Sequence, residues 1–396
     1  MKETKFKNTE IGKIPEEWKM YSIGKDCSVK ARIGWQGLTT SEYLQTGHYG
    51  LITSTDLIEG KVNWDTCVFV SEERYKQDTN IIVKNGDVLV SKDGTIGKVA
   101  VVSNLQYPTT LNSGVFVIRT KNEKITQEGL GLVFISPYFK DFIKRLTAGS
   151  TIVHLYQKDI VNFTFPIPTL PEQHRIASAL TSIDNLISSL GKLIEKKKNI
   201  KQGTMQQLLT GQIRLKGFSE PWGEKKLEEV CSVKRGVRVV KRNLTTDGLY
   251  PVYQNTNFPL GYSNQYNVEA NTPFVIIGGS AGQVGICRER YWAADDCAFF
   301  ACHDIYKEYL YYVLLLNQSN ILHNVRTGTI PRLDRSFLSN MVVYISSNID
   351  EQQAIATILT KMDDEITALE AKRAKYEAIK QGMMQQLLTG KIRLIS

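Results

Sequence analysis

The chain has 396 residues, 42% of them hydrophobic and 22% charged, which is an ordinary globular composition but more length than a typical single domain needs. Its formal net charge of +9 favours a polyanionic partner, foremost nucleic acid, although charge alone does not fix a fold. The N-terminus lacks the apolar core of a secretory signal, and the most apolar run, Tyr309 to Leu316, is far shorter than the roughly 20 residues that span a bilayer. We therefore expect a cytoplasmic protein without a membrane segment.

The cysteines and histidines show no pattern typical of a metal site or a catalytic site. The six cysteines contain no CxxC pair, and an intracellular setting favours free, buried thiols. Cys297, Cys302 and His303 could supply part of a zinc site, but no second ligand pair lies at a suitable spacing. The five histidines are scattered, without a paired-ligand or triad spacing. We predict no metal site and no catalytic histidine.

The first part of the chain, residues 1–165, alternates short β-type runs with turns and is predicted to form an α/β module. Strands are expected at Val62 to Val70, Gly86 to Ser91, Lys98 to Ser103 and Val115 to Thr120.

A long helix is predicted within residues 166–215. Pro171 pre-sets the first helical turn, and Thr169 and Glu172 have the spacing of a capping box. The helix should continue to Leu209 and stop at Gly211, because glycine tolerates the left-handed conformation that ends helices. Its apolar residues alternate between spacings of four and three, the a/d rhythm of a coiled coil: Ile176, Leu180, Ile183, Ile187, Leu190 and Ile194.

A second α/β module is predicted over residues 216–345, with a strand at Phe274 to Gly278. Its start repeats that of the first module, since Trp222 precedes Cys231 by the same distance that Trp18 precedes Cys27. Beyond this point the two modules diverge. One fold with two different surfaces is the natural interpretation.

A second long helix is predicted within residues 346–396 and repeats the first. More than half of the aligned positions are identical, and both copies end in QQLLTG followed one residue later by IRL. Asn348 and Glu351 occupy the capping positions, and Gly390 the stop. The apolar stripe again has coiled-coil spacing: Ile355, Leu359, Met362, Ile366 and Leu369.

So narrow an apolar stripe must be buried against a partner. The simplest partner is the other copy, so we expect the two helices to pair within one chain; the alternative is a dimerisation element. At 1.5 Å per residue, about 40 residues would make a rod roughly 60 Å long.

Known catalytic motifs are missing. The segment Gly94 to Val99 resembles a P-loop, but the glycines are too close together and Val99 stands where a magnesium-binding hydroxyl belongs. Asn271 to Phe274 resembles the Asn-Pro-Pro-aromatic motif of adenine methyltransferases, but the first proline is absent. No clustered carboxylates have the spacing of a nuclease site. We predict that the chain is not an enzyme and has no catalytic residues.

Three features together resemble the specificity (S) subunit of type I restriction-modification systems. They are the Ile-Pro-x-x-x-Glu-Gln segment ending at Gln173, the Gln-x-Leu-Leu-Thr-Gly helix endings, and the run from Gly86 to Gly97. The resemblance covers the whole chain. It implies two α/β (α+β) target-recognition domains joined by two long antiparallel coiled-coil helices with pseudo-twofold symmetry. It also implies that the N-terminal strip completes the scaffold beside the final helix.

The same resemblance implies a non-catalytic subunit that reads a bipartite DNA sequence, one half-site per recognition domain. Its implied partners are double-stranded DNA, two methyltransferase (M) subunits and restriction (R) subunits. S-adenosylmethionine, ATP and magnesium would act on those partners, and no cofactor is expected in this chain. The implied layout is recognition domain 1 at 1–165, helix 1 at 166–215, recognition domain 2 at 216–345 and helix 2 at 346–396.

DNA contacts are expected in loops, because sequence is read by Arg or Lys on guanine and by Asn or Gln on adenine, while other cations hold phosphates. The candidates in the first module are Arg32, Trp35, Gln36, Ser91, Lys92 and Thr95. The candidates in the second module are Arg235, Arg238, Lys241, Arg242, Gln254, Asn255, Asn257, Arg332 and Arg335.

Two alternatives remain open at this point. A coiled-coil adaptor that binds protein rather than DNA would show no salt-dependent affinity for a duplex. An enzyme with its own methyltransferase site would bind its cofactor as an isolated chain, and the sequence offers no cofactor domain for it.

Overall fold

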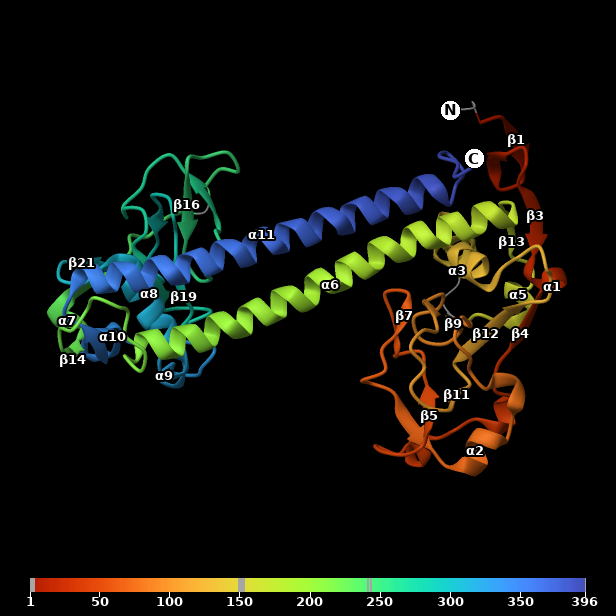
Figure 1. The fold of residues 1–396 in the computed structure, drawn as a ribbon, viewed down its shortest axis with the longest axis horizontal. Helices are drawn as coiled ribbons and strands as arrows, with labels where there is room; N and C mark the ends of the chain where they lie inside the picture. Colours follow the sequence, from red (N-terminus) through yellow and green to blue (C-terminus); the bar gives the residue numbers. More distant parts are fainter. Residues whose placement is uncertain (1–3, 149–153, 241, 243, 396) are drawn as a thin grey trace. The chain divides into compact units, whose positions relative to one another are not determined.

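The computed structural model describes residues 4–148, 154–240, 242 and 244–395. It divides the chain into two compact units (Figure 1). Unit 1 comprises residues 1–189 and 373–396, and unit 2 comprises residues 190–372. Among the described residues, no helix is both long and apolar enough to cross a membrane.

Two long helices, α6 (Leu170–Leu209) and α11 (Ile349–Leu387), contribute residues to both units. Within unit 1, the first part of α6 lies beside the last part of α11, and Lys380 Nζ donates to Asp184 Oδ1 at 2.7 Å (Figure 1). Within unit 2, Lys201 Nζ donates to Asp363 Oδ1 at 2.5 Å. These contacts require opposite chain directions, so the predicted antiparallel pairing of the two copies is confirmed.

The predicted heptad positions face this pairing. Ile176 and Leu180 pack with Leu387 and Leu388 in unit 1. Three of the positions, Ile187, Met362 and Leu369, are only half-buried, and the other eight are buried: Ile176, Leu180, Ile183, Leu190, Ile194, Ile355, Leu359 and Ile366.

Unit 1 contains a four-stranded antiparallel sheet, a three-stranded sheet and a two-stranded ribbon. The four-stranded sheet has the order β10 (Val99–Val101), β9 (Val88–Ser91), β12 (Val115–Thr120), β4 (Cys27–Lys30). The three-stranded sheet has the order β11 (Thr109–Leu111), β5 (Tyr49–Ile52), β8 (Val68–Val70). The ribbon pairs β3 (Lys19–Ser22) with β13 (Thr164–Ile167).

Unit 2 repeats this topology. Its four-stranded sheet has the order β19 (Val284–Ile286), β18 (Pro273–Ile276), β21 (Cys297–Cys302), β15 (Cys231–Arg235). Its three-stranded sheet has the order β20 (Trp292–Ala293), β16 (Tyr250–Tyr253), β17 (Gly261–Ser263), with β20 parallel to β16 as β11 is to β5. The ribbon pairs β14 (Trp222–Lys226) with β22 (Val342–Ser346). The expectation of one fold in two copies is confirmed.

Short elements complete each unit. Unit 1 has the hairpins β1 (Phe6–Thr9) with β2 (Gly12–Pro15) and β6 (Leu57–Ile58) with β7 (Lys61–Val62). Its short helices are α1 (Ile23–Asp26), α2 (Glu72–Lys76), α3 (Gln127–Ile135), α4 (Pro137–Thr147) and α5 (Gln157–Ile160), with 3-10 turns at Gly34–Gln36, Thr40–Glu42 and Thr79–Ile81. Those of unit 2 are α7 (Leu227–Val230), α8 (Lys307–Leu316), α9 (Gln318–His323) and α10 (Arg335–Asn340).

One predicted strand needs correction. The run from Val62 to Val70 is not continuous, since β7 ends at Val62 and β8 begins at Val68. The intervening turn is fixed by polar side chains: Thr66 Oγ1 donates to Asp56 Oδ1 at 2.8 Å and to Asn63 O at 3.1 Å. Such local bonding to Asn, Asp and Thr side chains competes with strand pairing.

Candidate nucleic-acid interface

In each unit a buried glutamate at the start of one long helix binds an arginine that follows the end of the other long helix. Glu172, fully buried in unit 1, accepts from Arg393 Nε at 2.6 Å, from Arg393 Nη2 at 2.8 Å and from Trp18 Nε1 at 3.1 Å. Because Trp18 comes from the N-terminal strip and Arg393 from the C-terminal end, this cluster brings both ends of the chain to the start of α6. The expected closure of the N-terminal strip beside the final helix is confirmed.

The same cluster recurs in unit 2. Glu351 accepts from Arg214 Nε at 2.6 Å, from Arg214 Nη2 at 2.9 Å and from Trp222 Nε1 at 2.9 Å, and it gains a bond from Ser346 Oγ at 2.6 Å. Burial of Glu351 opposes its ionisation, but the hydrogen bonds from Arg214, Ser346 and Trp222 outweigh that effect and hold the pKa of Glu351 below its ordinary value. The Glu and Arg of the duplicated sequence are therefore structural partners.

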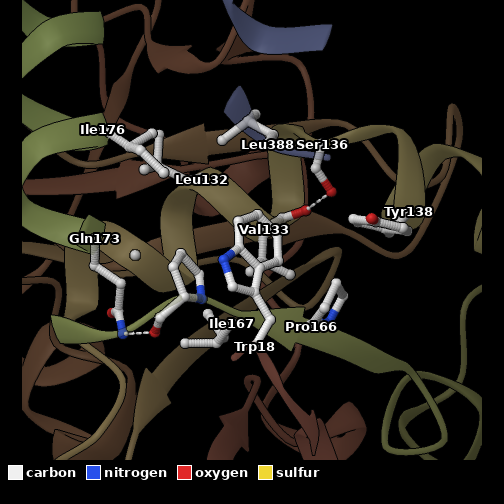
Figure 2. A pocket seen from close by; sticks show the side chains of 12 residues that line it. Trp18, Leu132, Val133, Ser136, Tyr138, Pro166, Ile167, Gln173, Ile176 and Leu388 are labelled. Carbon is white, nitrogen blue, oxygen red and sulfur yellow. Dashed lines mark hydrogen bonds between the residues drawn. The ribbon is translucent and has the colours of Figure 1, made fainter. Parts of the chain in front are cut away.

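The neighbouring glutamine ties each α/β unit to its helix. Gln173 Oε1 accepts from Thr126 N at 2.9 Å, just before α3, and Gln352 Oε1 accepts from Tyr306 N at 2.8 Å, just before α8. Figure 2 shows Gln173, Trp18 and Leu388 among the residues that line a small, mainly apolar cavity. These lining residues belong to the scaffold joint, and the cavity is too small for an organic ligand.

In unit 2, three loops meet at the end of the four-stranded sheet. The β18–β19 loop, 277–283, donates from Ser280 N to Asn255 O at 2.9 Å and from Gly279 N to Pro331 O at 3.2 Å. It thereby touches both the β16–β17 loop, 254–260, and the segment between α9 and α10, 324–334. Gly279 has φ +85°, and a Cβ there would lie 2.8 Å from Asn255 Cβ, so this close approach requires glycine.

Cations are fixed at the same place. Arg332 Nη1 lies 3.4 Å from Asp296 Oδ1, and Arg235 Nε donates to Asp295 O at 2.7 Å. The side chains of Arg235, Asn255 and Arg332 are all exposed. Predicted candidates from three separate segments thus converge on one surface, which we call the unit 2 loop cluster: residues 235, 254–260, 277–283, 295–296 and 324–334.

Unit 1 has an equivalent arrangement around the β9–β10 loop, 92–98. Leu155 N donates to Lys92 O at 2.9 Å, as Leu333 N donates to Ile277 O at 3.0 Å in unit 2. By this register His154 corresponds to Arg332. Asp93, in the β9–β10 loop, forms an ion pair with His154 when that ring is protonated. We call residues 92–98 with His154 the unit 1 loop cluster.

The carboxylate that pairs with His154 in unit 1 or with Arg332 in unit 2 lies beside a different strand in each unit. In unit 1 it is Asp93, after β9, facing Gly114 before β12. In unit 2 the place of Asp93 is taken by Gly278, and the carboxylate is Asp296, in the place of Gly114. In unit 2 a Cβ on Gly278 would lie 2.5 Å from Asp296 Oδ1, so the Asp296 side chain would have to move if Gly278 were replaced.

The structure corrects the assignment of two candidates in unit 1. Arg32 is 1% exposed, and its guanidinium donates to Leu111 O at 2.9 Å and to Thr110 Oγ1 at 3.2 Å, so it supports the fold instead of facing a ligand. Ser91 is fully buried, and its hydroxyl donates to Thr95 O at 2.6 Å and accepts from Lys98 N at 2.9 Å. Neither side chain is available to DNA.

The other candidates differ in accessibility. Gln36 is largely buried, and Lys92 is half-buried with Nζ 5.3 Å from the Phe116 ring centre. Gln254 and Asn257 are half-buried. Lys241 and the side chain of Trp35 lie outside the described part of the structure. The exposed candidates outside those already placed are Thr95, Arg238, Arg242 and Arg335. Their DNA contacts remain predictions.

Sequence reasoning missed Asp296, Arg326 and His154. A signal was present, because Thr-Ile-Val-His-Leu at 151–155 parallels Thr-Ile-Pro-Arg-Leu at 329–333. Among the described residues, no cluster of three His, Cys, Asp or Glu side chains could hold a metal ion. Burial raises the pKa of the Cys231 and Cys302 thiols to about 12, so neither has the character of a reactive cysteine.

The structure therefore contains the same α/β unit twice, and each copy carries a loop cluster at the corresponding place. The sequence profile of the type I restriction modification DNA specificity domain matches residues 15–202 and 219–381. The chain belongs to this family.

Relatives include the putative type I restriction enzyme MjaX specificity subunit of Methanocaldococcus jannaschii, 24% identical over 99% of this chain and 98% of that protein. The MjaVIII specificity subunit of the same organism is 28% identical over 54% of this chain, and the match spans only half of that relative's length. The solved S subunit of a type I restriction-modification system from M. genitalium has a TM-score of 0.68 at 16% identity, covering 93% of this chain and 96% of that one. This likeness shows a shared fold.

Proposed function

We propose that this chain is the DNA-recognition subunit of a type I restriction-modification complex and that each unit binds one half of a split target. The observation that carries the proposal is the pair of equivalent loop clusters with different side chains on a duplicated scaffold. A constant scaffold with variable loops is the arrangement expected when two different short sequences are read.

The chemistry of the unit 2 loop cluster suits a duplex. Arg235 and Arg332 can bind phosphates or the guanine edge, and Asn255 can bind adenine through its amide. The glycine-rich β18–β19 loop lets backbone approach a ligand closely. The net charge of +9 adds long-range attraction to a polyanion.

Catalysis is assigned to partners. Two methyltransferase subunits would dock on the duplicated scaffold, one per copy, because a repeated surface offers two equivalent sites. Restriction subunits would join them. S-adenosylmethionine, ATP and magnesium would be bound by those subunits.

The first test is DNA binding by the chain co-expressed with its methyltransferase subunit. Mapping the methylated adenines gives both half-sites and their spacing. Arg332→Ala should then weaken binding and, if Arg332 holds a phosphate, lower the slope of log affinity against log salt by about one. Arg290→Ala is the matched control, since Arg290 is exposed and paired with Glu269 after β19, at the opposite end of that strand from the loop cluster. Absence of salt-dependent duplex binding by the unmodified complex would support the coiled-coil adaptor instead.

The second test is exchange of one recognition segment. Replacing residues 1–165 with the corresponding region of a relative should change one half of the methylated sequence and leave the other half intact. The reciprocal exchange of residues 216–345 should change only the other half. If either exchange altered both halves, independent reading by the two units would be refuted.

A further inference from the structure

The segment between α9 and α10 contains a tight hairpin, residues 326–332, which we call the finger. Arg326 N donates to Arg332 O at 2.8 Å, and Arg332 N donates to Arg326 O at 3.1 Å. Its base is bonded twice to the β18–β19 loop, because Pro331 O accepts from Gly279 N and Leu333 N donates to Ile277 O. These backbone bonds fix the direction in which the finger leaves the domain.

The tip of the finger is exposed. Thr327, Gly328, Thr329 and Ile330 are all exposed, and 56% of Ile330 is accessible. A lone exposed isoleucine is unremarkable on a protein surface. This one differs because it stands on a short hairpin between two arginines, Arg326 and Arg332.

Both arginines can reach a polyanion. The Arg326 side chain is 82% exposed and its nearest carboxylate, Asp334, is 4.0 Å away. The Arg332 side chain is 57% exposed and faces Asp296 at 3.4 Å. Ion pairs this long and this open to solvent on the arginine side are weak, so phosphates can compete for both guanidiniums.

An apolar branched side chain between two arginines on a rigid hairpin fits the minor groove of DNA. Arginine is attracted to the strong negative potential of a narrow minor groove, and apolar wedges inserted between base pairs unstack and kink the duplex by about 20–90°. We propose that the finger enters the minor groove of the half-site bound by unit 2 and that Ile330 is the wedge that bends the DNA. This inference rests on the proposed DNA-recognition function.

The test measures the bend of the mapped target by fluorescence energy transfer between its ends, in the complex with the methyltransferase subunit. Ile330→Ala should lose most of the bend contributed by this half-site. Val342→Ala is the control, because Val342 is a β-branched residue of unit 2 with a similar exposure of 51% on β22, outside the loop cluster. Thermal unfolding of both variants should match that of the unmodified protein, since both side chains are exposed.

A second arm identifies the groove. Replacing adenines other than the methylated one with 2,6-diaminopurine adds an amino group to the minor groove only, and replacing guanine with inosine removes one. At the step where the finger enters, these changes should alter the bend of the unmodified complex and leave Ile330→Ala unaffected. An unchanged bend in Ile330→Ala, or no bend in the unmodified complex, would overturn the finger proposal while leaving DNA recognition intact. No specific binding by the unmodified complex would overturn the proposed function itself.

Discussion

Replacement of Arg393 by alanine probes the buried carboxylate that closes unit 1. The Arg393 side chain is 6% exposed and gives Glu172 two of its hydrogen bonds. After the substitution, Glu172 keeps Trp18 Nε1 at 3.1 Å and Leu394 N at 3.3 Å. Removing one partner of a buried ion pair typically costs about 3–5 kcal/mol, because the remaining charge stays desolvated. We expect unit 1 to lose stability in that range.

The chain supplies its own control at the equivalent residue of unit 2. The Arg214 side chain is 30% exposed, and Glu351 keeps two good donors, Trp222 Nε1 at 2.9 Å and Ser346 Oγ at 2.6 Å. Solvent can also reach the gap left by Arg214→Ala. The expected loss is therefore nearer that of one hydrogen bond to a charged group, about 1.5–3 kcal/mol. The loss of stability in Arg393→Lys should lie between the losses in Arg393→Ala and Arg214→Ala, because lysine keeps the positive charge but not the planar guanidinium that binds both carboxylate oxygens.

Hydrogen exchange read by mass spectrometry assigns the loss to a unit, whereas one global unfolding curve would average over both. In Arg393→Ala, exchange should accelerate most in the β1–β2 hairpin and in residues 388–395. In Arg214→Ala, it should accelerate in the β14–β22 ribbon. Equal losses in the two variants, or a loss below about 1 kcal/mol for Arg393→Ala, would refute the claim that burial sets the magnitude.

Three further predictions concern the scaffold and the thiols. Gln352→Ala leaves Tyr306 N unpartnered at the start of α8 and should cost about 1–3 kcal/mol, seen as faster amide exchange in the first turn of that helix. The pKa of Glu351 is lower in the folded state than its unfolded value of about 4.3. The stability that ionised Glu351 gives to unit 2 is therefore fully present above the unfolded pKa and is lost as pH falls through the lower folded pKa. Glu351→Gln should remove this acid dependence when denaturation is measured as a function of pH. Burial raises the pKa of four thiols to about 12: Cys27, Cys67, Cys231 and Cys302. At pH 8 these thiols should react slowly with iodoacetamide in the native protein and fully after unfolding, as measured by mass spectrometry.

The helical scaffold was predictable because its signals are local or periodic. The entry proline, the a/d stripe and the glycine stop of α6 lie within one continuous segment, and the structure begins and ends that helix at Leu170 and Leu209. The Glu172 carboxylate, which we predicted to cap the helix start, instead accepts from Arg393 and Trp18. The repeated sequence in α11 shows the same pattern and supported the same prediction a second time. Pairing then followed from the narrowness of the stripe.

The loop candidates were harder to predict because burial there depends on contacts distant in sequence. Arg32 has the residue type of a DNA reader, but its partners Leu111 and Thr110 are brought to it only by the folded sheet. Asp296 gave no sequence signal, since its relation to Arg332 depends on the register of β18 against β21. In contrast, Asn255 was recognisable as an amide in a turn and Arg235 as a cation at the end of a strand, both local properties.

The carboxylate of the loop cluster stands at a different position in each of the two copies. In unit 1 Asp93 lies opposite Gly114, and in unit 2 Gly278 lies opposite Asp296, so each unit presents one carboxylate to residue 154 or 332 from a different position. A loop transplanted between such domains must therefore bring the facing strand end with it, because a graft of either loop alone would deliver two carboxylates or none.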